Sequence, residues 1–186
     1  MTTFHYFAYG SNMLTARLRA RCASAAFKTI ARVTGHQLTY SKRSYDGSGK
    51  ATLKPAEPDS TVTGVVFEID RREADILHQA EGPGYAFIDD FLVTCRYTGA
   101  TISTGTYIAF RHDHTIKPYD WYLALILAGV AEHNLGAEHA ALHRSIAYDV
   151  DTDHERRERL IALEALEHTG VADYTALLSN FRTGDG

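Results

Sequence analysis

A glutamate directly before a break in the chain is the first residue of this sequence that could do chemistry. Glu81 precedes Gly82-Pro83-Gly84, and the apolar pattern before it predicts a helix that ends there. The helix dipole opposes a negative charge at this end, so a partly buried glutamate would hold its proton to a higher pH than usual. Such a carboxyl group suits general acid–base catalysis, although the position also fits an ordinary solvated glutamate.

A short glycine-containing turn near the N-terminus is the second candidate. Tyr9-Gly10-Ser11-Asn12 ends an aromatic-rich predicted strand and precedes a run with helical spacing. The backbone N–H groups of such a turn converge, and the helix dipole adds positive potential, so the turn suits a carboxylate or a phosphate. Gly10 lets a ligand approach the backbone because it has no Cβ. The alternative is a helix capped by Ser11 or Asn12, with no ligand.

Tyrosines and histidines supply further polar candidates. Phenol groups can line a pocket and hydrogen-bond a polar ligand, and five of them flank predicted strand ends and helix starts: Tyr6, Tyr9, Tyr85, Tyr119 and Tyr122. The run 112–114 (His-Asp-His) and the pair His139 and His143 could contact a metal ion. Neither has an apparent third ligand, and the pair lacks the glutamate of a His-Glu-x-x-His site. We therefore expect no metal site.

These candidates need a scaffold, and the apolar pattern places strands before helices. Strands are predicted at residues 4–9, 27–40 (bent at Gly35), 61–69, 85–97 and 102–110. Helices are predicted at 13–18, 70–80, 118–133, 137–146 and 153–168, with capping boxes at Asp70 with Glu73 and at Thr152 with Glu155. Residues 45–49 and 55–60 are interpreted as an exposed loop and a turn. This order favours an α+β fold with a mostly antiparallel or mixed sheet that could close into a barrel.

Length and charge limit the classes of protein that the chain can belong to. At 186 residues, 45% hydrophobic and 23% charged, it can form one domain with a genuine core. The net charge of −4, without a basic tail, argues against nucleic acid or an anionic membrane as the main partner. The start has no secretory pattern, and the apolar run 123–130 is too short to span a bilayer. We interpret the chain as one cytoplasmic domain, 1–186, with a core over about 4–146 and a helical extension over about 150–186 that serves packing or a homodimer.

Three motifs, taken in order, resemble the γ-glutamylcyclotransferase family (the γ-glutamylcyclotransferase-like or AIG2-like superfamily). The first is Phe-Ala-Tyr-Gly-Ser-Asn-Met at 7–13, and the second is Gly-Val-Val-Phe at 64–67 followed by a helix and Glu81-Gly82. The third is Pro-Tyr-Asp-Trp-Tyr-Leu at 118–123, which leads into Leu-Ala-Gly-Val at 127–130. The resemblance spans about 4–146. It implies a small mixed β-barrel flanked by helices, in agreement with the α+β interpretation.

The resemblance also implies a reaction. In this family the free α-amine of a γ-glutamyl group attacks its own γ-carbonyl and expels an amine, which leaves 5-oxoproline. By analogy, Glu81 deprotonates the attacking ammonium and returns the proton to the leaving nitrogen. The residues implied in substrate binding are Tyr9, Gly10, Ser11, Asn12, Tyr85 and Tyr122. Because ring closure is intramolecular, positioning supplies much of the acceleration, and neither a metal nor an organic cofactor is implied.

The substrate itself stays open at this point. Ser11-Asn12 after Gly10 resembles the general branch of the family more than the glutathione-specific or γ-glutamylamine branch. The short segment 82–84 borders the leaving-group side. Two alternatives remain beside the enzyme: a non-catalytic module of the same fold that binds a small carboxylate, and an acyl enzyme that removes γ-glutamyl protecting groups from a biosynthetic intermediate. A metal-dependent hydrolase is a third.

Overall fold

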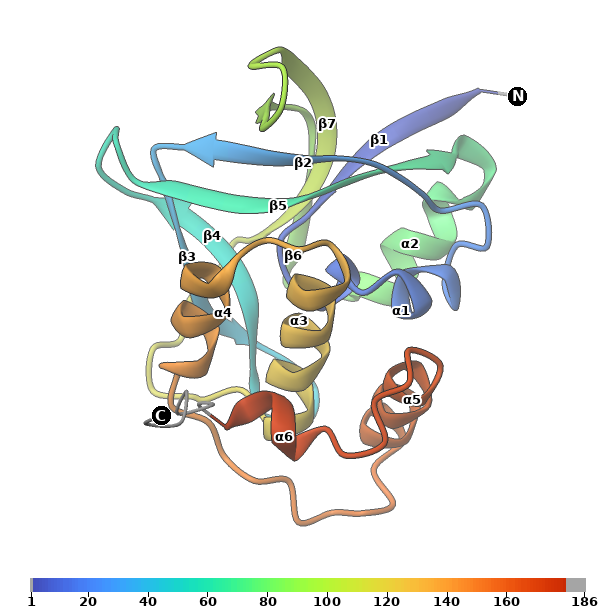
Figure 1. Cartoon of the computed structure of the whole chain (residues 1–186), viewed down its shortest axis with the longest axis vertical. Helices are drawn as coiled ribbons and strands as arrows, with labels where there is room; N and C mark the ends of the chain where they lie inside the picture. The colour runs from blue at the N-terminus through green and yellow to red at the C-terminus, as the bar shows by residue number, and fades with distance from the viewer. Residues whose placement is uncertain (1, 180–186) are drawn as a thin grey trace, which may run out of the picture.

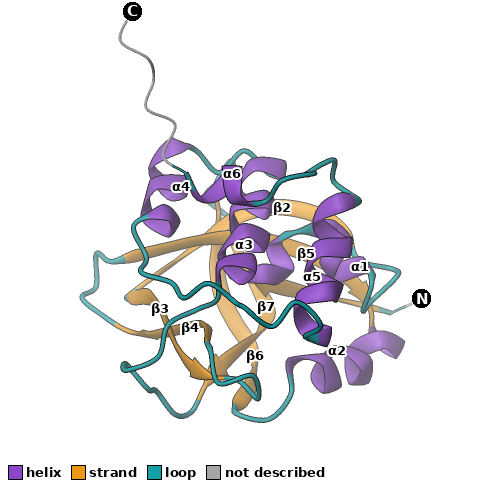
Figure 2. Ribbon diagram, turned by 90° about the horizontal axis from the view of Figure 1, so that it is seen from below, coloured by secondary structure: helices purple, strands orange, loops and turns teal. Residues whose placement is uncertain are grey.

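The structure, a computed structural model, describes residues 2–179 and is built around a closed five-stranded barrel (Figures 1 and 2). The strand order around the barrel is β1-β5-β2-β6-β7. Neighbouring strands are antiparallel except β1 and β7, which run parallel where Tyr6 lies opposite Gly105. The α+β prediction with a mixed barrel is therefore confirmed. The bounds are β1 Thr3–Ala8, β2 Ala26–Thr34, β5 Thr61–Asp70, β6 Tyr85–Cys95 and β7 Thr101–Ala109.

Apolar burial explains why these segments form strands. In β5, Val65, Val66 and Phe67 are fully buried, and the strand pairs with β1 on one side and β2 on the other. The last residues of β1 are buried as well, including Phe7. This burial fixes the end of β1, and with it the place where the chain enters the turn at Gly10.

A second, two-stranded sheet lies beside the barrel. It pairs β3 (His36–Arg43) with β4 (Gly49–Pro55), and Gly35, at φ +66°, makes the predicted bend between β2 and β3. The sequence interpretation missed β4. The hairpin is fastened to the barrel by the hydroxyl of Thr52, which accepts a hydrogen bond of 2.9 Å from the amide of Ala109.

The loop between β3 and β4 is only partly exposed, which corrects the interpretation of 45–49 as an exposed loop. Tyr45 is 87% exposed, as expected. The side chain of Asp46, by contrast, is buried, because it forms an ion pair of 2.8 Å with Lys50 and accepts hydrogen bonds from Ser48.

One helix, α3 (Asp120–Glu132), is buried along almost its whole length, from Asp120 to Val130. Figure 1 shows it between the barrel and the C-terminal helices, and it contacts α4, α5 and α6. An apolar surface on all sides is typical of such a central helix. The other helices are α1 Thr15–Arg19, α2 Ala74–Glu81, α4 Ala137–Arg144, α5 Arg157–Glu167 and α6 Thr175–Leu178, with short 3₁₀ turns at η1 Ser11–Met13 and η2 Arg71–Glu73.

The predicted helix caps are only partly right. Neither Ser11 nor Asn12 caps a helix, since η1 starts after Gly10 and α1 after Leu14, both without a side-chain cap. The hydroxyl of Ser11 instead accepts a hydrogen bond from Arg17, and the amide of Asn12 bonds other side chains. Tertiary partners have therefore displaced the local capping bonds.

The two predicted capping boxes also differ from the structure. Asp70 does cap η2 by accepting from the amide of Arg72 at 2.9 Å, but Glu73 bonds Ser24 instead of returning to Asp70. The box at Thr152 is wrong, because α5 begins only at Arg157 and has no side-chain cap.

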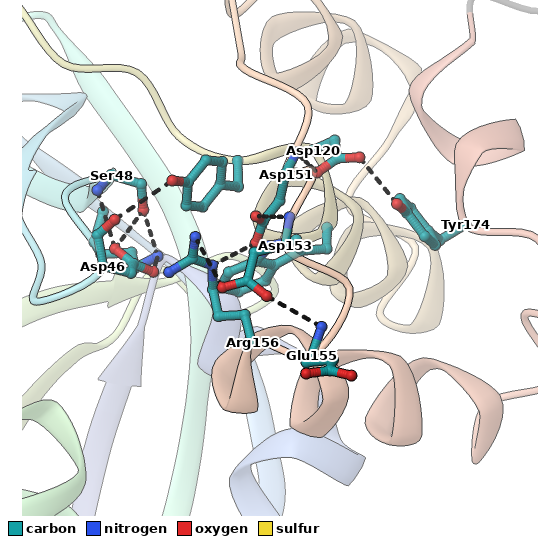
Figure 3. A network of polar contacts seen from close by, with 11 residues as sticks. Asp46, Ser48, Asp120, Asp151, Asp153, Glu155, Arg156 and Tyr174 are labelled. Atoms are coloured by element: carbon teal, nitrogen blue, oxygen red, sulfur yellow. Dashed lines mark hydrogen bonds and ion pairs between the residues drawn. The ribbon is translucent and has the colours of Figure 1, made fainter.

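The C-terminal extension is tied to α3 by a buried polar network (Figure 3). Asp151 accepts a hydrogen bond of 2.8 Å from the indole of Trp121 and one of 2.7 Å from Arg156. The hydroxyl of Tyr174 donates to Asp120 at 2.9 Å. These bonds hold α5 and α6 against α3. The last residues of the predicted extension, 180–186, lie outside the described part of the chain.

Gly129 allows α3 to approach the turn that follows β1. A Cβ at this position would lie 2.8 Å from the backbone nitrogen of Leu14 and 2.9 Å from the carbonyl carbon of Met13. We expect Gly129→Ala to lower the free energy of unfolding by about 1–3 kcal/mol, the usual effect of overpacking a core. Denaturant titration measures it, and unchanged stability would contradict this close contact.

Candidate active site

All seven residues predicted from the sequence line one cavity at the end of the barrel where β1 and β7 end and β6 begins. The wall also contains Tyr6, one of the five tyrosines singled out, and two residues that the sequence interpretation did not include, Ala51 and Tyr107. We call this space the inner cavity; its lining residues are Tyr6, Tyr9, Gly10, Ser11, Asn12, Ala51, Glu81, Tyr85, Tyr107 and Tyr122. Tyr119, one of the five tyrosines singled out, lies elsewhere and donates from its hydroxyl to the carbonyl of Asp46.

Among the described residues, 2–179, Glu81 is the only carboxylate on the wall of the inner cavity. It is the last residue of α2, and Gly82 leaves the helix at φ +70°, as the chain break predicts. Its side chain is 14% exposed, and Oε1 accepts hydrogen bonds from Asn12 Nδ2 at 2.6 Å and Arg21 Nη1 at 2.9 Å. Within residues 2–179 no group donates to Oε2, so this oxygen is available to a ligand.

Arg21 is a site residue that the sequence interpretation missed. Its Nη1 also donates to Asn12 Oδ1 at 3.0 Å, so Arg21, Asn12 and Glu81 bond one another in a triangle. The hydroxyl of Tyr6 accepts the second N–H of Asn12 at 3.0 Å. The guanidinium forms an ion pair of 2.9 Å with Glu81, at a helix end where the sequence interpretation considered only the dipole.

Buried tyrosines make the rest of the inner wall. Burial, followed by the charge of Glu81, raises the pKa of Tyr6 and Tyr9. Burial also raises the pKa of Tyr85 and Tyr122. These phenols are therefore neutral hydrogen-bonding groups near pH 7, and Glu81 is the group on this wall suited to accept a proton.

The tyrosine hydroxyls are held by the backbone around them. Tyr85 donates to the carbonyl of Ala51 at 2.6 Å, and the amide of Ala51 donates to Tyr122 at 3.0 Å. Tyr9 donates to the carbonyl of Tyr107. These bonds fix the shape of the cavity before any ligand arrives, which is the preorganisation that catalytic sites require.

The turn after β1 lines the same space with Gly10, Ser11 and Asn12. Within residues 2–179, the amides of Gly10, Ser11 and Asn12 donate to no protein group. A Cβ on Gly10 would lie 3.1 Å from the Cβ of Ala51 and 3.4 Å from the hydroxyl of Tyr122. Glycine thus keeps the inner cavity open at this point, as expected from the sequence.

The two histidine pairs gain no third metal ligand within the described residues. Within residues 2–179 no group of three or more His, Cys, Asp or Glu side chains is placed to hold a metal ion. His143 lies 2.6 Å from the hydroxyl of Tyr40 and 3.2 Å from His139. Burial, followed by the nearby His139, lowers the pKa of His143 to about 3. This neutral histidine is part of the core.

The burial of His143 leads to a pH-dependent stability. Between pH 6.5 and about 3 the unfolded chain binds a proton at this residue and the folded chain does not, so stability falls with falling pH. We expect a slope of up to about 1.4 kcal/mol per pH unit from this group. His143→Gln, which can still bond Tyr40, should flatten the slope in denaturant titrations, whereas the exposed His168→Gln should not. An equal slope in His143→Gln would contradict this origin.

The helices of the described chain, residues 2–179, include none with the length and apolar character needed to cross a membrane.

Comparison with known proteins identifies the family. The sequence model of the family described as gamma-glutamyl cyclotransferase, AIG2-like, matches residues 6–123. Gamma-glutamylcyclotransferase of Homo sapiens is 28% identical over 175 residues (90% of this chain and 82% of that protein), and that of Mus musculus is 30% identical over 143 residues (74% and 75%).

Solved structures agree with this result. A structure titled gamma-glutamyl cyclotransferase has a TM-score of 0.77 at 27% identity and covers 88% of this chain and 99% of that one. A glutathione-specific enzyme from yeast has a TM-score of 0.56 at 15% identity (91% and 97%), which shows a shared fold alone. The chain therefore belongs to the gamma-glutamyl cyclotransferase, AIG2-like family, and its relatives are enzymes.

Proposed function

We propose that this chain is a cofactor-free γ-glutamylcyclotransferase that converts γ-glutamyl compounds to 5-oxoproline and a free amine. The observation that carries the proposal is that one cavity is lined both by Glu81, whose Oε2 is free of protein partners within residues 2–179, and by Gly10, Ser11 and Asn12, whose amides are unbonded in the same part of the chain. Membership of the family and the names of its relatives support the same activity.

The chemistry of the inner cavity suits a γ-glutamyl group. Its α-carboxylate would accept hydrogen bonds from the amides of Gly10, Ser11 and Asn12. Its α-ammonium would lie at Oε2 of Glu81. The hydroxyls of Tyr85 and Tyr122 would help to orient the chain so that the amine faces the γ-carbonyl.

Glu81 would carry protons in both directions. It takes a proton from the α-ammonium, and the free amine then attacks the γ-carbonyl, which forms the new C–N bond. Collapse of the tetrahedral intermediate breaks the bond to the leaving nitrogen. In total two protons leave the α-nitrogen and two reach the leaving amine, so one carboxyl group can transfer them in turn without a co-reactant.

The direct test is to incubate the protein with γ-glutamyl-L-alanine and to measure 5-oxoproline. Release of 5-oxoproline and alanine, insensitive to a chelator, supports the proposal. Thermal stabilisation by the dipeptide without turnover would instead favour the carboxylate-binding module. Turnover restricted to γ-glutamylated biosynthetic intermediates would favour the protecting-group-removing enzyme.

Location and assembly belong to this proposal as well. Cys22 and Cys95 are both free and buried, which supports a reducing compartment, and we place the enzyme in the cytoplasm. A homodimer would cover part of the surface of the C-terminal helices. Cell fractionation tests the first statement, and sedimentation analysis at several concentrations tests the second.

A further inference from the structure

A second cavity joins the inner one at Glu81, on the side of the Gly82 break. We call it the outer cavity. Its volume is about 240 Å³, against about 30 Å³ for the inner cavity, and the two share Ser11, Glu81, Tyr85 and Tyr122 in their walls. A ligand whose reacting carbonyl lies at Glu81 therefore has room to extend only into the outer cavity. In the proposed reaction, that part of the ligand is the leaving amine.

The outer cavity carries an excess of positive charge. Within residues 2–179 its wall has four cations, Arg17, Arg21, Lys42 and Lys50, against three carboxylates, Asp46, Glu81 and Glu158. Two of the cations have a carboxylate partner, because Arg21 contacts Glu81 at 2.9 Å and Lys50 contacts Asp46 at 2.8 Å. Within residues 2–179 no carboxylate lies within 4.0 Å of Arg17 or Lys42. Two cations on this wall are therefore without a protein counter-ion in the described chain.

Lys42 is the more informative of the two. It lies on β3, is only 5% exposed, and holds its Nζ 4.7 Å from the centre of the Tyr85 ring. Burial lowers its pKa, while the charge of Glu81 acts in the opposite direction. A buried ammonium costs free energy unless an anion or hydrogen-bond acceptors compensate it. An anionic ligand in the outer cavity would provide that compensation.

Arg17 approaches the outer cavity from the other side, from α1. Its Nε donates to the hydroxyl of Ser11 at 3.1 Å, and within residues 2–179 the other guanidinium N–H groups donate to no protein group. Lys50 also lines the outer cavity, but it is paired with Asp46, and its Nζ lies 4.5 Å from the centre of the Trp121 ring. It adds positive potential but is already bonded.

The C-terminal extension supports this wall. Trp121, on which Lys50 stacks, is fixed by Asp151, and Arg156 lies 5.1 Å from the ring of Tyr119, whose hydroxyl bonds the carbonyl of Asp46 (Figure 3). The extension therefore fixes both the Trp121 ring that Lys50 contacts and the loop that carries Asp46, the ion-pair partner of Lys50. This gives the extension a role in shaping the outer cavity.

We propose that the outer cavity is the leaving-group subsite and that Lys42 and Arg17 select γ-glutamyl compounds whose leaving amine carries two carboxylates. The inference rests on the proposed function. Each cation without a protein counter-ion would bind one carboxylate, with charge-assisted hydrogen bonds. A leaving amine without a carboxylate would leave both cations without a counter-ion. An amino acid with one carboxylate would leave one cation without a counter-ion.

A series of γ-glutamyl substrates tests this selection. γ-Glutamyl-ethylamide has no carboxylate on the leaving amine, γ-glutamyl-L-glutamine has one, and γ-glutamyl-L-glutamate has two with almost the same size as the glutamine compound. We expect kcat/KM for 5-oxoproline release to rise about ten-fold at each step, the usual size of one charge-assisted bond. Equal values for the glutamine and glutamate compounds, or the reverse order, would overturn the proposal.

Lys42→Met tests the residue itself. Methionine keeps an unbranched stem beside Tyr85 and removes the charge, so we expect the fold to survive, which thermal melting checks. The preference for the glutamate over the glutamine compound should fall about ten-fold, mainly through KM. Lys54→Met is the matched control, because Lys54 lies on β4 outside the outer cavity, and it should keep the wild-type preference. A preference unchanged in Lys42→Met would exclude Lys42 as the selecting residue.

A binding measurement separates this inference from the proposed function. If no compound of the series releases 5-oxoproline, the proposed function fails. Calorimetric titration with intact γ-glutamyl-L-glutamate and γ-glutamyl-L-glutamine, which differ only in the leaving amine, then still decides the subsite. Tighter binding of the glutamate compound that is lost in Lys42→Met supports it, and equal affinities overturn it.

Discussion

Glu81→Gln is expected to lower kcat for 5-oxoproline release by about 10³-fold, within the range that general acid–base catalysis contributes. The glutamine amide cannot take a proton from the α-ammonium or return one to the leaving nitrogen. The fold should survive, because the amide oxygen can still accept the bonds that Asn12 and Arg21 now donate to Oε1. KM should change little, since the lost interaction belongs to the transition state.

The chain offers a matched control for this variant. Glu167 is the last residue of α5, as Glu81 is the last residue of α2, but it is exposed and outside both cavities. Glu167→Gln should therefore keep wild-type turnover and melting temperature. Turnover in Glu81→Gln close to that of the wild type would remove Glu81 from the mechanism, whatever the family resemblance implies.

The local parts of this site could be predicted because each depends on a short pattern. The alternation in β5 gave a strand at 61–69 where the structure has Thr61–Asp70, and the helix after it placed Glu81 at its end. The turn at Gly10 follows directly from the end of the strand before it. The hydrophobic period, the glycine turns and the helix ends each depend on residues that are neighbours in the sequence, so they can be predicted from it.

The missed residues depend on contacts between distant segments. Arg21 follows the five-residue helix α1 and meets Glu81 across 60 positions of sequence, and nothing in its own neighbourhood marks it out among several arginines. Tyr107 lies on β7 and joins the site only through the barrel pairing. Lys42 faces the outer cavity because β3 pairs with β4, a strand that the pattern did not reveal. These contacts depend on the register and the order of the strands, and the hydrophobic period of the sequence predicts neither of them.

The same limit explains the wrong caps. Ser11, Asn12 and Glu73 all have side chains that favour helix starts, and each bonds a tertiary partner instead. A long-range bond can replace the local capping bond because either one satisfies the same polar group. Local rules therefore misassign polar residues that fit a cap by their spacing but have a partner from a distant segment.

Arg21→Met is expected to lower kcat by about 10²-fold, the size of effect that a small misplacement of a catalytic group produces. Arg21 touches no reacting atom in the proposed mechanism; it holds Glu81 and Asn12 through one nitrogen, Nη1. Without it the carboxylate keeps only its bond to Asn12 and can rotate away from the α-ammonium. Arg19→Met is the control, because Arg19 is the last residue of α1, two positions before Arg21, but donates to the carbonyl of Ala25.

Rescue by lysine distinguishes positioning from a merely structural role of Arg21. Lysine restores a cation beside Oε1 of Glu81, so Arg21→Lys should recover part of the kcat that Arg21→Met loses. KM should change little in both variants, because the proposed substrate contacts stay in place. A loss of turnover together with a lowered melting temperature, and with no recovery in Arg21→Lys, would mean that Arg21 only supports the fold. Recovery by lysine at an unchanged melting temperature would place the cation in control of the carboxylate on which the proposed proton transfers depend.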